Sequence, residues 1–188
     1  EASAKSWISV IRTKAVLNGQ IELAIARNEG KERTGKVTVT EKNGDIAPIE
    51  LTIVQQPSKL AVVQGILDKV YEALDGRYWR IPWVPGESWP GFEYDEEKDR
   101  VSLRFENLGL KGEIPECIGE LGERLSRLSI GQEPGLTGSL PDSFRNLTSL
   151  ESLSILRTGM TGLPDVFSGM TALSIVTIID NDSMTGPL

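Results

Sequence analysis

A run of acidic residues offers the first candidate for chemistry in this chain. Asp95, Glu96, Glu97 and Asp99 lie together in the segment 95–99, and a pair of carboxylates is what glycoside hydrolysis requires. A solvated turn ahead of a strand also explains the run, since charged side chains favour water. We predict the turn and keep hydrolysis as the alternative.

Other patterns that suggest catalysis or metal binding are incomplete. Asp180 and Asp182 begin like a calcium loop, but Met184 stands where a third oxygen ligand belongs. Cys117 is the single cysteine, and it has no possible histidine partner because the sequence contains no histidine. We therefore expect no metal, no other cofactor and no enzymatic activity, and we expect Cys117 to be a small packing residue.

Aromatic residues gather in the segment 71–105, which holds eight of the eleven in the chain. Sugars stack on exposed Trp and Tyr rings, so this segment contains a candidate glycan-binding site. The alternative is that the rings fill a small core, where large aromatic side chains dominate packing. The glycan interpretation requires at least two exposed coplanar rings among its four members, Tyr78, Trp79, Trp83 and Trp89.

Composition narrows the class of protein. The chain has 188 residues, 39% of them apolar and 25% charged, which suits one or two soluble domains. A net charge of −7 argues against nucleic-acid partners and against docking to an anionic membrane, because both attract basic surfaces. The sequence has no signal peptide and no apolar run long enough to insert into a membrane.

One pattern recurs four times in the last ninety residues. Its anchors Leu110, Leu136, Met160 and Met184 are 26, 24 and 24 residues apart, and a fixed period of this size predicts a solenoid with a parallel sheet. Each copy also contains a short predicted strand with two core residues: Leu103 and Phe105, Leu128 and Ile130, Leu153 and Ile155, and Val176 and Ile178.

The residues between and beside these core residues point to the opposite face of the sheet. On a solenoid this face is concave, and it offers a surface for a partner rather than a catalytic pocket. A merely solvated surface is the alternative. The predicted partner-binding residues are Arg104, Asn107, Arg127, Ser129, Gln132, Ser154, Arg157, Thr177 and Asp180.

The motif Leu136-Thr137-Gly138-Ser139-Leu140-Pro141 resembles the plant-type leucine-rich repeat, and the resemblance covers residues 101–188. Trp89-x-Gly91-Phe92-x-Tyr94-Asp95 resembles the N-terminal cap of that family, with Tyr94 in place of a cysteine. The family's ladder asparagine survives only as Asn181. Leu108, Glu133 and Thr158 replace it in the other turns, so we expect irregular convex loops there.

Residues 1–56 alternate as strands do, for example at Leu23 and Ile25. The stretches Trp7-Ile8-Ser9-Val10, Arg33-Thr34-Gly35 and Ile49–Gln56 resemble the second half of a BACON domain, an Ig-like module of Bacteroidetes. We expect a partial antiparallel sandwich whose first strands are missing. A helix over 58–75 should follow, with Ser58 as N-cap and Gly76 at its end.

Together these patterns predict a mostly β, α+β protein: a partial sandwich (1–57), a helix with an aromatic cap (58–100) and repeats (101–188). The resemblances imply an exported extracellular or outer-membrane surface protein, with its leader upstream and further chain or a second chain beyond the last repeat. The predicted function is non-enzymatic binding of a protein partner through the concave face. Glycan or mucin binding through the aromatic cap or the sandwich is the alternative.

Overall fold

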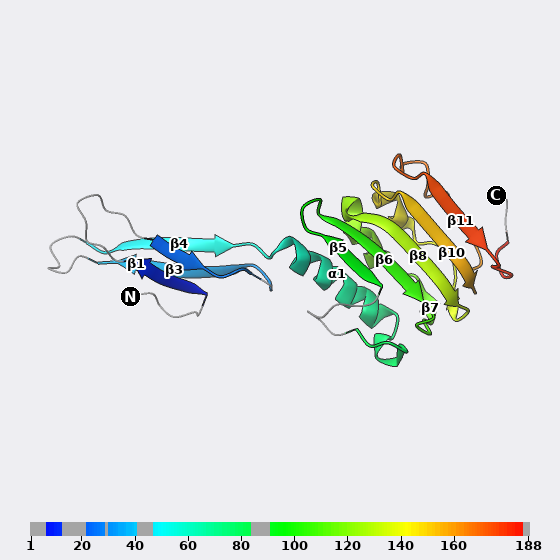
Figure 1. Cartoon of the computed structure of the whole chain (residues 1–188), viewed down its shortest axis with the longest axis horizontal. Helices are drawn as coiled ribbons and strands as arrows, with labels where there is room; N and C mark the ends of the chain where they lie inside the picture. The colour runs from blue at the N-terminus through cyan, green and yellow to red at the C-terminus, as the bar shows by residue number, and fades with distance from the viewer. Residues whose placement is uncertain (1–6, 13–21, 29, 41–46, 84–90, 186–188) are drawn as a thin grey trace. The chain divides into compact units, whose positions relative to one another are not determined.

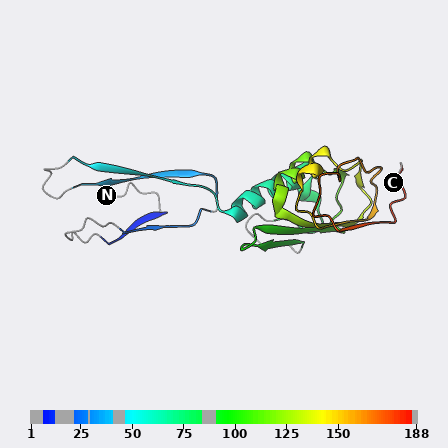
Figure 2. The same ribbon diagram turned by 90° about the horizontal axis from the view of Figure 1, so that it is seen from above.

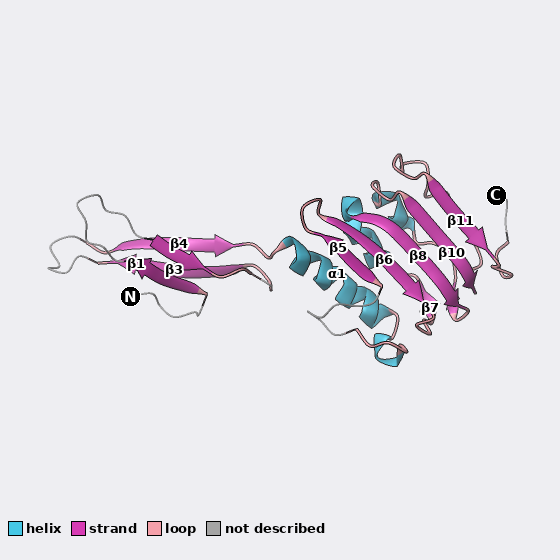
Figure 3. Ribbon diagram, in the orientation of Figure 1, coloured by secondary structure: helices cyan, strands magenta, loops and turns pink. Residues whose placement is uncertain are grey.

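A computed structural model describes residues 7–12, 22–28, 30–40, 47–83 and 91–185 of the chain (Figures 1 and 3). The chain divides into two compact units, Glu1–Val62 and Val63–Leu188. Most of the regular secondary structure in the described residues is strand, as predicted. None of their helices has the length and apolar character needed to cross a membrane.

The first unit contains two small antiparallel sheets. β1 (Ile8–Arg12) pairs with β2 (Glu22–Ile25), and β3 (Arg33–Val39) pairs with β4 (Ile49–Gln55). Trp7, Ile8 and Val37 form a buried cluster that joins the two sheets. Gly35 packs closely against this cluster, since a Cβ atom at this position would lie 2.5 Å from Ile8 Cδ1 and 2.9 Å from the Trp7 ring. The alternation of residues 1–56 thus corresponds to strands, as expected.

The helix that follows is α1 (Lys59–Ala73), and it buries Val63, Ile66, Leu67 and Val70. Ser58 caps it as predicted, since its Oγ accepts a hydrogen bond from the Ala61 N–H at 3.1 Å. The predicted role of Gly76 is wrong. The left-handed residue after the helix is Asp75, with a φ of 50°, and Gly76 starts the 3₁₀ turn η1 (Gly76–Tyr78).

Gly76 instead leaves room for an aromatic ring. A Cβ atom at this position would lie 2.0 Å from the ring of Tyr71. The glycine is therefore required by close packing rather than by its own backbone angle.

The second unit is built on a five-stranded sheet in the order β11-β10-β8-β6-β5. β5 (Phe92–Asp95) is antiparallel to β6 (Arg100–Glu106). The strands β6, β8 (Leu125–Glu133), β10 (Ser152–Thr158) and β11 (Ile175–Ile179) are parallel. The short helices η2 (Glu116–Arg124) and η3 (Asp142–Asn146) lie behind this sheet (Figure 2).

The register of the parallel strands follows the predicted period. Leu103 aligns with Leu128, Leu153 and Val176, so equivalent residues of successive repeats stack beneath the sheet. The three leucines are buried, whereas Val176, which was predicted as a core residue, is 48% exposed because no described strand follows β11. A second small sheet pairs β7 (Gly112–Glu113) with β9 (Leu136–Thr137) in parallel. The core between the sheets is fully buried and includes Leu110, Leu121, Leu136, Phe144, Leu147, Leu153 and Met160.

At one turn that lacks the ladder asparagine, a glutamate supplies the missing hydrogen bonds, so the irregular loop expected there is not needed to satisfy the backbone. The buried carboxylate of Glu133 accepts hydrogen bonds from three consecutive N–H groups: those of Leu108, Gly109 at 2.9 Å and Leu110 at 2.7 Å. A carboxylate thus replaces the amide, because both present acceptor oxygens to the backbone of the neighbouring turn.

The last ladder position keeps the expected asparagine. Asn181 accepts a hydrogen bond from the Thr158 N–H at 2.9 Å and donates one to the Ile155 carbonyl at 2.9 Å. It therefore bridges two consecutive turns, as predicted for this position.

Candidate functional site

The exposed face of the parallel sheet is organised in three rows of side chains that run across the strands. The register sets these rows. The first is Glu93, Ser102, Arg127, Ser152 and Ile175; the second is Arg104, Ser129, Ser154 and Thr177; the third is Glu106, Gly131, Leu156 and Ile179. This face is the surface that the sequence predicts to bind a partner.

The second row brings together four predicted binding residues, one from each parallel strand. Arg104 is exposed, whereas Ser129, Ser154 and Thr177 are half-buried. Arg127 lies on β8, diagonal to Arg104, because Ser102 aligns with Arg127 and Arg104 aligns with Ser129. Neither guanidinium forms an ion pair with another described residue.

Four other predicted residues mark the ends of the parallel strands. Asn107, Gln132, Arg157 and Asp180 all have left-handed backbone, with φ between 53° and 56°. Residues other than glycine rarely adopt this conformation, and Asn and Asp do so most readily. These positions turn the chain away from the sheet, which makes them structural whatever their side chains bind.

Three of these side chains already have partners. Arg157 Nε lies 3.2 Å from Asp180 Oδ2 in an exposed ion pair, and Asn107 accepts hydrogen bonds from the guanidinium of Arg80. A ligand that used these groups would first have to displace those contacts. Arg104 and Arg127 form no ion pair with a described residue, so a ligand can bind them without displacing one.

The sequence prediction missed the third row of the face. Glu106, Leu156 and Ile179 alternate with the core residues of their strands, so strict period-two alternation would have found them. Ile179 and Ile175 are 48% and 56% exposed. The β11 end of the face is therefore apolar, while the β6 end is charged.

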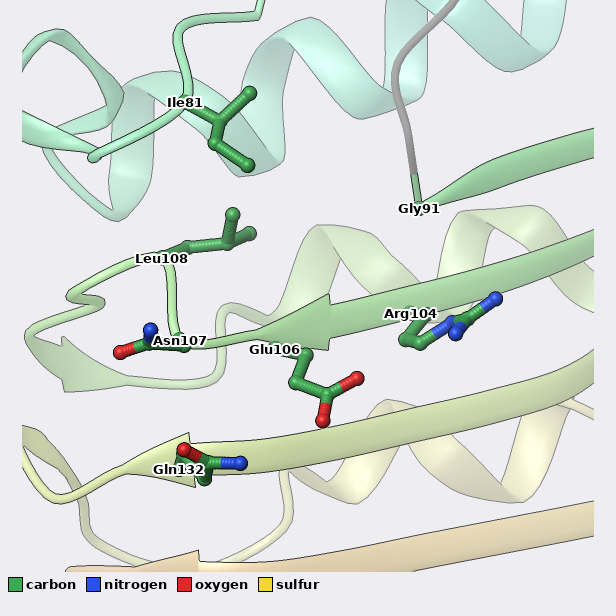
Figure 4. A pocket seen from close by; sticks show the side chains of 7 residues that line it. All are labelled: Ile81, Gly91, Arg104, Glu106, Asn107, Leu108 and Gln132. Atoms are coloured by element: carbon green, nitrogen blue, oxygen red, sulfur yellow. The ribbon is translucent and has the colours of Figure 1, made fainter.

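A cavity of about 360 Å³ opens at the charged end of the face (Figure 4). Ile81, which is 40% exposed, lies above it, and Arg104 and Glu106 project from β6 along its wall. Gly91 borders the cavity and accepts a hydrogen bond from the Arg104 N–H at 2.7 Å. The other lining residues are Asn107, Leu108 and Gln132.

Two of the four rings on which the glycan interpretation rests are buried in the aromatic cap. Trp79 and Trp83 are buried, with exposures of 7% and 5%, and Trp89 lies outside the described residues. Trp79 donates to the Leu74 carbonyl at 3.0 Å and Trp83 to Asp68 Oδ1 at 2.8 Å. Tyr78 is 69% exposed and carries the Arg77 guanidinium 4.9 Å from its ring centre. Trp79 and Trp83 therefore pack the cap, and neither presents a ring face to solvent.

The acidic run has structural partners. Asp95 accepts a hydrogen bond from the Lys98 N–H at 3.0 Å, and this bond lowers the pKa of the carboxyl. Asp99 accepts from the Tyr94 hydroxyl at 2.9 Å and pairs with Arg124 at 3.2 Å. Burial, reinforced by this bond to Asp99, raises the pKa of Tyr94 to about 12. These contacts form the predicted turn before β6.

Cys117 is half-buried on η2. Burial, with a smaller contribution from the nearby Glu120 carboxylate, raises the pKa of its thiol, so the thiol stays protonated and unreactive near neutral pH. Within the described residues no group of three or more acidic or cysteine side chains is arranged to hold a metal ion.

Comparisons with known proteins find matches among solved structures. A plant ice-binding protein is 29% identical over 61% of this chain, with a TM-score of 0.53. The BIR2 ectodomain from Arabidopsis thaliana is 18% identical over 61% of this chain and 68% of its own length, with a TM-score of 0.48. The ectodomain of the receptor kinase SOBIR1 from the same plant is 19% identical over 68% of this chain and 75% of its own, with a TM-score of 0.45.

The likeness is confined to part of each protein. This chain spans 38% of the length of the ice-binding protein. No family model and no curated protein matches the chain. The parallel register of the repeats supports a leucine-rich-repeat-like fold for the second unit. The ice-binding protein is structurally similar over 61% of this chain.

Proposed function

We propose that this chain is a non-enzymatic recognition protein that binds a protein partner through the exposed face of its parallel sheet. The observation that carries the proposal is the composition of this face. Arg104 and Arg127 lie exposed at one end, with no ion pair to another described residue, and Ile175 and Ile179 lie half exposed at the other. An exposed surface with both charged and apolar anchors is typical of protein interfaces.

The more specific parts of the proposal, which concern architecture and location, come from the sequence resemblances. The repeats form a solenoid, the first unit is a partial Ig-like sandwich of BACON type, and the protein belongs to the exported surface proteins of Bacteroidetes. The two small sheets that share Trp7, Ile8 and Val37 support a sandwich.

Glycan binding through the aromatic cap is not proposed as a second function. Stacking on a sugar requires exposed rings, and Trp79 and Trp83 are buried. Among the described members of that predicted site, Tyr78 alone is exposed, and a single ring does not form the expected platform.

Affinity capture from cell-surface extracts tests the proposed function. The full chain and its Arg104→Glu variant are immobilised, and the retained proteins are quantified by mass spectrometry. Lys111→Glu is the matched control, because it makes the same charge change at an exposed position next to β7. We expect at least one protein that the parent chain and the control retain and Arg104→Glu loses. Identical sets of proteins for all three chains would contradict the proposal.

A further inference from the structure

The side chains of the exposed sheet face change from charged to small to apolar between β6 and β11. This order determines which side chains of a partner can pack on each part of the face. Charged side chains occupy β6 and the start of β8. Small residues follow in the centre, where Ser129, Ser154 and Gly131 form a low floor. Leu156, Ile175 and Ile179 then make the far end apolar.

The low floor suits an extended backbone. Serine hydroxyl groups both donate and accept hydrogen bonds, so Ser129 and Ser154 satisfy either the N–H or the C=O groups of a segment lying on them. Their small size also allows that segment to approach the sheet closely. A bulky or aromatic centre would have prevented this approach.

The charges of the face favour an acidic group at the β6 end. Arg104 and Arg127 are diagonal neighbours on adjacent strands, so their positive charges reinforce each other. Glu106 lies two residues from Arg104 on the same face of β6, and Glu93 aligns with Ser102. Neither carboxylate forms an ion pair with a described residue, so both guanidinium groups can pair with an acidic group of the partner. Guanidinium groups also bind carboxylates through two parallel hydrogen bonds.

The strand spacing sets the distance between the two anchors. Neighbouring strands lie about 4.8 Å apart, so the three intervals from β6 to β11 span about 14 Å. An extended segment advances about 3.3 Å per residue, and side chains two and four residues apart point to the same side. Residues i, i+2 and i+4 of such a segment therefore reach β6, the central floor and β11.

We infer that the partner presents an extended segment with an acidic residue at position i, a small residue at i+2 and an aliphatic residue at i+4. The acidic group contacts Arg104 and Arg127, the small residue lies over Ser129 and Ser154, and the aliphatic side chain packs on Ile175 and Ile179. This inference rests on the proposed function and names the chemistry of its partner.

A display library of random nine-residue peptides, selected on the full chain, tests the inference. The enriched peptides are synthesised with capped ends, and their affinities are measured by fluorescence anisotropy. We expect the acidic, small and aliphatic residues at the stated spacing. Arg104→Glu should weaken binding at least tenfold, and a peptide with lysine in place of its acidic residue should recover that loss.

Two further variants locate the binding. Ile179→Ser should weaken binding of peptides with an aliphatic residue at i+4, whereas the control Lys111→Glu should leave their affinity unchanged. Ser154→Arg fills the central floor and should abolish binding of every peptide that uses the face. Each variant is checked by its melting temperature, and all these positions are at least partly exposed.

The outcomes separate the inference from the proposed function. Ser154→Arg could instead abolish the binding of peptides that carry a basic residue in place of the acidic one, or that lack the i, i+2, i+4 spacing. That result would overturn the inference and leave the proposed function in place. If no peptide depends on Ser154, the inference is wrong, and affinity capture then decides the proposed function independently.

Discussion

At the scale of single residues, Glu133 is the least expected contributor to the fold. Its buried carboxylate accepts hydrogen bonds from the N–H groups of Leu108, Gly109 and Leu110. Glu133→Ala leaves these three donors without an acceptor, so we expect the free energy of unfolding to fall by about 3 to 5 kcal/mol in urea titrations. Glu133→Gln keeps one acceptor oxygen and should lose less. An alanine variant within about 0.5 kcal/mol of the parent would contradict this role.

The raised pKa of Tyr94 predicts that the stability of the fold falls at alkaline pH. Its hydroxyl donates to Asp99, and its pKa is raised to about 12 from the ordinary value of 10.0. Because the folded-state pKa is the higher one, the phenol stabilises the fold fully below pH 10, and this contribution is lost as the pH rises towards 12. Unfolding curves of the parent and of Tyr94→Phe should converge over this range. Parallel curves from pH 8 to 12 would exclude the effect.

At the scale of elements, the aromatic cap holds α1 against the first repeat. The Trp79 ring meets those of Tyr71 and Phe105 edge-on, at centroid distances of 5.1 and 6.0 Å. Trp79→Ala should therefore lower the free energy of unfolding by about 3 to 5 kcal/mol. Tyr78→Ala, one residue away on an exposed ring, should change it by less than about 0.5 kcal/mol. Equal losses in the two variants, measured by thermal unfolding, would contradict this view of the cap.

The sequence predicts the elements better than it predicts their contacts. Period-two alternation and the recurring motif place Leu103, Leu128 and Leu153 in one buried column, because sheet register depends on these local patterns. The bonds of Glu133 were not predictable in this way. These bonds join Glu133 to the preceding turn, which lies next to it only in the folded protein. In the sequence alone, a glutamate at the asparagine position suggests that the ladder hydrogen bonds are missing.

In the candidate site, too, local patterns predict which residues share a face but not which residues contact each other. Alternation places Arg104, Ser129 and Ser154 on the exposed face, and the same alternation extended by one step places Leu156 and Ile179 there as well. The ion pair of Arg157 with Asp180 and the burial of Trp79 required the three-dimensional structure, because both join residues from different elements.

At the scale of the whole molecule, the repeats bring residues from four strands onto one continuous face. Individual positions such as Ser154 have no chemistry of their own, but together with Arg104 and Ile179 they form a surface with two anchors and a low centre. The leucine-rich-repeat-like fold thus supplies regular spacing, and the variable positions supply the recognition chemistry.

Site-specific photo-cross-linking tests this account most directly. A photoreactive residue is placed at Ser154, in the centre of the face, or at Lys111, beside β7, and each chain is irradiated with cells or extracts that contain candidate partners. We predict a discrete cross-linked protein from position 154 and none from position 111. Cross-linking from position 111 alone, or equally from both positions, would contradict recognition through the exposed sheet face.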